Sequence, residues 1–277
     1  MQAIILIGPA RSGTKILRDT IATHPQINKV GYDINFIWKK YNEQVPHDAL
    51  QADQASPQLI RFVRKYFKKQ AGTAPMVIEK TVSNTLRIPF VLRVFPNAKF
   101  VFLYRDGRDA VESVRRQWGT APGAKYLIQK FLSVPFLDVI PYVIKYAIDL
   151  IRIKLKWKTT EDYVWGVKYP GYEKDLQTKS TLDFCAHQWK HCIEAMQKDQ
   201  HHIDNSQMRT VHYEDFVTNP KKVLSDLATF LDVDANGFDT SQVKTGSVRK
   251  AKSKLTEAEY AHLNELLAPN LTALNYQ

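Results

Sequence analysis

Short apolar runs alternate with stretches of helical character along this chain, and the alternation restricts its fold more than any other feature. The apolar runs cover residues 3–8, 76–79, 99–104 and 209–213. Apolar residues at helical spacing fill the segments between and after them, at 14–23, 57–70, 84–95, 107–118, about 180–200 and 220–231. Strands separated by helices form βαβ units with right-handed crossovers. The sequence therefore predicts an α/β fold of three layers, with a mostly parallel central sheet flanked by helices.

No internal repeat and no low-complexity linker divides the 277 residues, so we expect one domain over residues 1–277. A variable hydrophobic and basic helical insert is expected at about 126–175. Its first part, residues 126–157, is apolar and aromatic but carries too many charges for a membrane span. It is either a pair of core helices broken at Pro141, or an amphipathic element that rests on an anionic membrane or lines an acceptor groove.

The chain is basic, with 39 Lys and Arg against 28 Asp and Glu and a net charge of +11. This surplus favours anionic partners, but no zinc finger or aromatic RNA-binding signature accompanies it, so we expect no nucleic-acid partner. Cys185 and Cys192 lie in one predicted helix, too far apart for a disulfide. We expect free thiols and no metal. Free thiols and the lack of a leader-like start favour a cytoplasmic location, with peripheral membrane contact if the insert binds lipid.

The segment Gly8-Pro-Ala-Arg-Ser-Gly-Thr-Lys15 follows the first predicted strand and enters a predicted helix. Such a turn directs backbone N–H groups and a helix N-terminus at an anion. Gly13 allows the backbone to approach a phosphate closely. Hydroxyl groups and cations come from the remaining polar residues of the loop: Arg11, Ser12, Thr14 and Lys15.

The alternative is a kinase that uses ATP and Mg²⁺ through a loop of the form G-x-x-x-x-G-K-[ST], with lysine directly after the second glycine. Here Thr14 follows Gly13, and Lys15 takes the place of the metal-binding hydroxyl. The order is inverted, which favours a phosphate ligand that needs no metal.

At this point the sequence resembles the sulfotransferases that use 3′-phosphoadenosine-5′-phosphosulfate (PAPS). Their loop reads P-[KR]-S-G-T-[TK], and residues 9–15 are similar, with one residue between proline and arginine. Residues 95–113 are similar to their F-P-x-A-K-F…R-D-[PG]-R-D-x-x-x-S segment. Glu79-Lys80-Thr81 resembles E-K-T-P, with Val82 in place of the proline. Two later segments, 211–220 and 245–250, resemble Y-E-D-L-x-x-[DN]-P and a basic loop that closes over the nucleotide.

The resemblance implies a fold like that of the P-loop NTPases and metal-independent, in-line transfer of a sulfuryl group from PAPS to a hydroxyl acceptor. The acceptor would be a glycan, lipid, small alcohol or tyrosine, and adenosine 3′,5′-bisphosphate (PAP) would be the product. Arg11 and Lys80 would stabilise charge on the transferred and leaving groups. The residues implied to bind the nucleotide are Arg11, Ser12, Gly13, Thr14, Lys15, Arg105, Ser113, Tyr213, Ser247 and Arg249. Among these, Ser12 to Lys15 would hold the 5′-phosphate, while Arg105 and Ser113 would hold the 3′-phosphate.

The general base is implied by residues 24–37, which are similar to the H-P-x-[apolar]…G-E-E-x-R segment of the tyrosylprotein branch. The second glutamate of that segment is the base, and its position is Asp33 here, followed by Asn35 where the family has arginine. Aspartate is one methylene shorter than glutamate. A histidine base, as in the branches acting on small phenols and steroids, is the alternative, and His24 and His47 are nearby in sequence.

Overall fold

The computed structural model describes residues 1–118, 164–244, 248 and 251–276. The chain divides into two compact units, residues 1–115 with 166–277, and residues 116–165. Most of the second unit, and with it the insert predicted at 126–175 up to residue 163, lies outside the described residues. The account below concerns the first unit.

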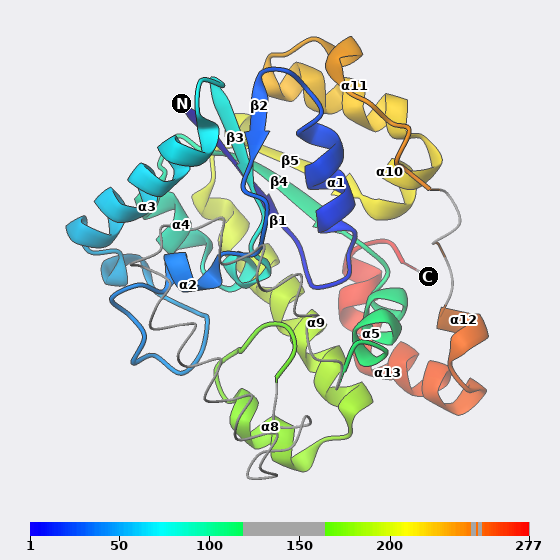
Figure 1. Cartoon of the computed structure of the whole chain (residues 1–277). Coiled ribbons are helices and arrows are strands. Elements are labelled where there is room, and N and C mark those ends of the chain that lie inside the picture. Colours follow the sequence, from blue (N-terminus) through cyan, green and yellow to red (C-terminus); the bar gives the residue numbers. More distant parts are fainter. Residues whose placement is uncertain (119–163, 245–247, 249–250, 277) are drawn as a thin grey trace, which may run out of the picture. The chain divides into compact units, whose positions relative to one another are not determined.

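The centre of this unit is a five-stranded sheet with the order β2-β3-β1-β4-β5 (Figure 1). Its strands are β1 (Gln2–Ile7), β2 (Ile27–Lys29), β3 (Met76–Glu79), β4 (Lys99–Tyr104) and β5 (Met208–His212). Every pair is parallel, with Ile4 opposite Ile78 and Leu6 opposite Val101. The predicted parallel sheet is confirmed. Its edge strand β2 was missed because only one of its three residues is buried, so it leaves no apolar run in the sequence.

Helices cover both faces of the sheet. Their bounds are α1 (Thr14–Ile21), α2 (Asn35–Trp38), α3 (Pro57–Ala71), α4 (Ile88–Val94), α5 (Gly107–Arg115), α8 (Tyr172–Thr178), α9 (Thr181–Asp199), α10 (Tyr213–Thr218), α11 (Pro220–Leu231), α12 (Ala251–Lys254) and α13 (Glu257–Ala273). Short 3₁₀ helices cover residues 52–54, 82–86, 200–202, 205–207 and 235–237. Among the described residues, no helix combines the length and apolar character needed to cross a bilayer.

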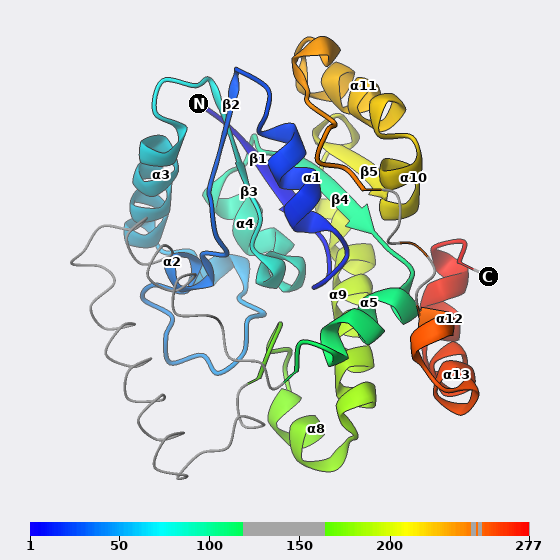
Figure 2. The same ribbon diagram turned by 45° about the vertical axis from the view of Figure 1, so that its right-hand side comes forward.

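The core explains which helices lie on which face. Ile4, Leu6, Val101 and Leu103 point to one side of the sheet and pack against apolar residues of α1, α10 and α11. The helices α4 and α9 lie behind the strands in both views (Figures 1 and 2). This arrangement confirms the predicted three layers, and it leaves the carboxyl ends of the parallel strands at one edge.

The helix predicted at 84–95 is instead a 3₁₀ helix at 82–86 followed by α4. The reason is Pro89, which has no N–H to donate and is tolerated only in the first turn of a helix. It lies in the first turn of α4, so a new helix begins at Ile88. The helix start predicted at Thr256 is confirmed by a capping box in which the Thr256 hydroxyl and the Glu259 carboxylate each accept the other residue's backbone N–H.

Candidate functional site

The loop between β1 and α1 adopts a backbone that requires glycine at its end. Gly13 is the N-cap of α1 with φ 87°, in the left-handed region that favours glycine. A Cβ atom added to Gly13 would lie 2.2 Å from Cδ2 of Tyr213. Ser12 is completely buried, and its Oγ has no hydrogen-bond partner within the part of the chain that the structure describes. A buried hydroxyl beside a helix N-terminus and a glycine fits a phosphate oxygen as its missing partner.

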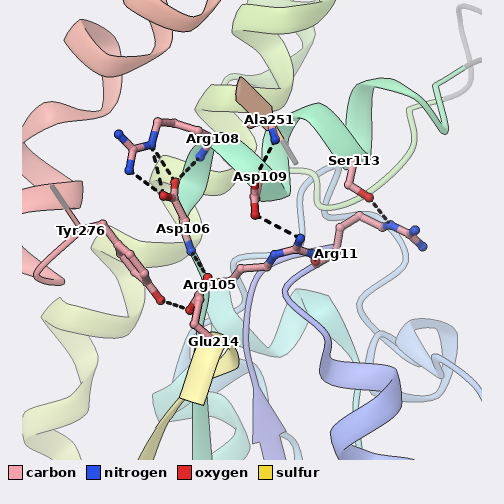
Figure 3. Close-up of polar contacts among 9 residues, drawn as sticks. All are labelled: Arg11, Arg105, Asp106, Arg108, Asp109, Ser113, Glu214, Ala251 and Tyr276. Carbon is pink, nitrogen blue, oxygen red and sulfur yellow. Dashed lines mark hydrogen bonds and ion pairs between the residues drawn. The ribbon is translucent and has the colours of Figure 1, made fainter. Parts of the chain in front are cut away.

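Arg105, directly after β4, is held over this loop (Figure 3). Its Nη1 donates to the carbonyl oxygen of Arg11 at 2.7 Å, and its Nη2 lies 3.5 Å from Oδ2 of Asp109. Its guanidinium carbon is 4.5 Å from the ring centroid of Tyr213. The side chain of Asp109 also accepts a hydrogen bond from the backbone N–H of Ala251. Arg105 is therefore a largely buried cation with a fixed orientation.

Arg11 connects the same loop to α5. Its φ is 63°, which is uncommon for a residue with a side chain, and its Nε donates to Oγ of Ser113 at 2.9 Å. The structure thus brings Arg11, Arg105 and Ser113 together, although they lie on two loops and a helix far apart in sequence. The ion pair between Arg105 and Asp109 was not predicted from the sequence, where Asp109 lies four residues after Arg105 in the first turn of α5.

Asp33 and Lys80 form the other part of the site. The Nζ of Lys80 lies 3.7 Å from Oδ2 of Asp33, and the Asp33 side chain remains 29% exposed. The carboxylate accepts backbone N–H bonds from Val82 at 3.1 Å and from Asn35 at 3.2 Å. The structure therefore places the predicted base and the predicted cation side by side.

Glu79 ends β3 and is close enough to Asp33 and Lys80 to interact with both electrostatically. Its carboxylate accepts hydrogen bonds from the hydroxyl of Thr81 and from Nδ2 of Asn84. Complete burial raises the pKa of Glu79 to about 7, and the nearby Asp33 carboxylate adds to the rise while the Thr81 hydrogen bond opposes it. The roles of Thr81, Asn84 and the Val82 N–H were not predicted from the sequence; Thr81 ends the E-K-T segment and the other two follow it.

Other predicted site residues lie as follows. Tyr213 begins α10, is buried, and packs on Gly13 and Arg105, so it is both a core tyrosine and part of the loop's support. Thr14 is also buried. The side chain of Lys15 differs from expectation: it is exposed and pairs with Asp19 at 3.0 Å, because both lie on the outer face of α1 one turn apart. Ser247 and Arg249 lie outside the described residues.

The two histidines considered as bases lie elsewhere or make other contacts. The Nε2 of His24 is 3.1 Å from the carbonyl oxygen of Asp234, at the end of α1 remote from its N-terminal loop. His47 follows α2; its backbone carbonyl oxygen accepts a hydrogen bond from Lys39, and its ring Nδ1 is buried without a hydrogen-bond partner among the described residues. Cys185 and Cys192 are buried free thiols in α9.

Comparisons with known proteins agree with this geometry. The model of a family described as "Sulfotransferase family" matches residues 3–135 and 163–237. The chain is 22% identical to the protein-tyrosine sulfotransferase of Drosophila melanogaster over 312 residues, covering 100% of this chain and 52% of that protein. It is 27% identical to protein-tyrosine sulfotransferase 1 of Mus musculus over 126 residues, covering 41% of this chain and 34% of the mouse protein. The chain thus spans about half the length, or less, of these curated relatives.

Solved structures show the same fold. The sulfotransferase domain from the curacin biosynthetic pathway superposes with a TM-score of 0.56 at 14% identity, covering 96% of this chain and 97% of that domain. The sulfotransferase domain of the Synechococcus PCC 7002 olefin synthase gives a TM-score of 0.55 at 14% identity, with 97% and 94% covered. The predicted sulfotransferase fold is confirmed.

Proposed function

Because this chain belongs to the sulfotransferase family, we propose that it transfers a sulfuryl group from PAPS to a hydroxyl acceptor and releases PAP. One observation carries the proposal: the Arg11–Ser113 hydrogen bond and the Arg105–Arg11 hydrogen bond join the loop after β1 to α5. The loop after β1 with the start of α1, and Arg105 with Ser113 of α5, therefore offer two anion sites that meet at one edge of the sheet. A donor with separate 5′ and 3′ phosphate groups suits this pair better than a nucleoside triphosphate does.

The roles we propose for the first anion site follow from burial and charge. The buried Ser12 hydroxyl, Gly13 and the first turn of α1, with Thr14 and the backbone of Lys15, hold the 5′-phosphosulfate. Arg11 lies on the same loop, where its cation can balance the sulfuryl oxygens.

The 3′-phosphate takes Arg105 and Ser113 as its partners. Arg105 is preoriented by Asp109 and by the ring of Tyr213, so its fork needs little reordering on binding. Ser247 and Arg249 complete the nucleotide site in this proposal.

The chemical step is an in-line displacement at sulfur. The acceptor oxygen forms a bond to sulfur as the bond from sulfur to the 5′-phosphate oxygen breaks. Asp33 takes the acceptor's proton, since its carboxylate is held beside Lys80 and remains accessible. Lys80 and Arg11 stabilise the negative charge that develops on the leaving oxygen and the sulfuryl oxygens. No step needs a metal.

Calorimetry with PAP, and with ATP and Mg²⁺, tests the donor site. We expect PAP to bind, and Arg105→Ala to weaken it roughly 10- to 150-fold, because a hydrogen bond to a charged group contributes about 1.5–3 kcal/mol. Arg61→Ala, on the exposed face of α3, is the matched control and should leave affinity unchanged. Tighter binding of ATP than of PAP, or an unchanged affinity in Arg105→Ala, would refute the assignment.

A screen with labelled PAPS tests the acceptor. Tyrosine peptides come first, because the similar proteins are named protein-tyrosine sulfotransferases; glycans, lipids and small alcohols follow. The buried free thiols also support our prediction of a reducing, cytoplasmic compartment, which cell fractionation tests. Liposome flotation tests peripheral contact with an anionic membrane.

A further inference from the structure

Two loops that carry the proposed base and the proposed cation are joined by a reciprocal pair of hydrogen bonds. The backbone N–H of Val82 donates to Oδ2 of Asp33 at 3.1 Å, and the backbone N–H of Ile34 donates to Oγ1 of Thr81 at 3.0 Å. Each loop thus donates one backbone N–H to a side-chain oxygen of the other loop. Thr81 has only one hydroxyl hydrogen, and it is donated to the buried carboxylate of Glu79. The Thr81 oxygen is therefore oriented to accept from Ile34.

The pair coincides with two departures from the pattern that this chain resembles. Val82 stands where proline is expected, and proline has no N–H to donate. Asp33 stands where a longer glutamate is expected. The N–H that valine supplies reaches the shorter carboxylate and holds it 3.7 Å from Nζ of Lys80.

We propose that the Val82 N–H and the Thr81 hydroxyl are positioning groups that hold the shorter Asp33 carboxylate in the place of a longer acid. This inference rests on the proposed function, in which Asp33 is the base. With Asn35 N–H on its other oxygen, the Asp33 carboxylate has both oxygens fixed by backbone donors. Fixing a reacting group in this way raises the rate by removing unproductive orientations.

Val82→Pro is the sharpest test, because the local backbone already suits proline. Thr81 has φ −117° and ψ 120°, the extended conformation that precedes proline. Val82 is the first residue of a 3₁₀ helix, a position where a helix makes no use of the N–H. The substitution therefore removes one donor and leaves the backbone in place. Val82→Ala keeps the N–H and is the matched control.

We expect Val82→Pro to lower kcat roughly 10- to 100-fold relative to Val82→Ala, with PAP affinity unchanged. Its acid limb in the pH–rate profile should move to higher pH, since a lost N–H bond to a carboxylate disfavours the charged form. Among the described residues, the charged groups near Asp33 include Glu79, Lys80, Arg87 and Asp48, and these are the same in both variants. Val82→Pro should cost less activity when Asp33 is replaced by glutamate than when Asp33 is present, because the longer acid no longer needs the donor.

The outcomes separate this inference from the proposed function. The inference is wrong and the proposed function stands if three results are found together: the wild type transfers a sulfuryl group, Asp33→Asn is inactive, and Val82→Pro has the same rate and pH profile as Val82→Ala. If the wild type binds no PAP, the function itself fails. Should Val82→Pro lose PAP binding through misfolding, Thr81→Val against Thr81→Ser tests the other hydrogen bond of the pair, because valine removes the oxygen that accepts from the Ile34 N–H and serine keeps it. Equal kcat and equal pH profiles in that pair would also overturn the inference.

Discussion

Gly13 and the ring of Tyr213 lie so close that alanine at position 13 should damage both the fold and the site. Two costs add. Gly13 has φ 87°, and placing an L-residue with a side chain in that region costs about 1–2 kcal/mol. The added Cβ would lie 2.2 Å and 2.3 Å from two ring carbons of Tyr213, and such overpacking typically costs about 1–3 kcal/mol. Together we expect Gly13→Ala to lower the free energy of unfolding by about 2–5 kcal/mol.

The chain offers a control that separates the two costs. Gly171 has nearly the same backbone, with φ 84°, and also caps a helix, but an added Cβ there would meet nothing within 4 Å. Gly171→Ala should therefore cost only the backbone term, about 1–2 kcal/mol. Urea unfolding of both variants with linear extrapolation gives the difference, which is the cost of the contact with Tyr213.

Nucleotide binding should also depend on the contact between Gly13 and the ring of Tyr213. The ring of Tyr213 supports the guanidinium of Arg105, so a ring displaced by the methyl group that Gly13→Ala adds would move Arg105 as well. PAP affinity should fall in Gly13→Ala and stay unchanged in Gly171→Ala. Adding Tyr213→Ala to Gly13→Ala should cost less than the sum of the single changes, because the clash is then gone. If Gly13→Ala were no more destabilising than Gly171→Ala, the argument from the Tyr213 contact would be refuted.

Two further predictions concern the buried carboxyl group of Glu79 and the partly buried hydroxyl group of Tyr276. Burial raises the pKa of Glu79 from 4.5 to about 7, so the folded state binds more protons than the unfolded state between these values, and stability falls as pH rises through them. Glu79→Gln should remove this fall in the free energy of unfolding, which is on the order of 3 kcal/mol, as measured by urea unfolding across this pH range. The control Glu265→Gln, at an exposed position on α13, should keep it. An unchanged pH dependence in Glu79→Gln would count against the reasoning. Tyr276→Phe should cost about 1.5–3 kcal/mol because the Tyr276 hydroxyl donates to Glu214. Thermal unfolding measures this loss of stability, with Tyr41→Phe at an exposed tyrosine as the control. PAP affinity should be unchanged, because Glu214 still accepts a hydrogen bond from the N–H of Asp106.

Much of the fold was predictable because its signals are local. The strands β1, β3 and β4 are buried and leave apolar runs, and the capping residues of α13 lie three positions apart. The strand β5 was also predicted, although only Val211 of its five residues is buried. The edge strand β2 and the break before α4 were missed for equally local reasons, a single buried residue and a proline. Sheet order itself is not local, since β1 pairs with strands that begin about 75 and about 100 residues later.

The candidate site was predictable in its residues but not in its contacts. The family resemblance implied Arg11 for the transferred sulfuryl group and Arg105 and Ser113 for the 3′-phosphate, yet nothing in the sequence shows that the Arg11 side chain bonds to Ser113. Lys15 shows the reverse case, a predicted ligand whose side chain pairs with Asp19 on the outer face of its helix. A loop motif fixes which groups are available, whereas the direction of each side chain depends on neighbours that are remote in sequence.

The order of the strands also separates the proposed donor side of the site from the proposed acceptor side. Because β1 lies between β3 and β4, the loop after β1 has Lys80 on one side and Arg105 on the other. Arg105 with α5 holds the nucleotide side in our proposal, so the acceptor must approach from the side of Lys80. Asp33 lies there, fixed to the loop after β3. We therefore expect acceptor choice to depend on the segment from β2 through α2, and changes in α5 to alter donor affinity while leaving the preferred acceptor the same.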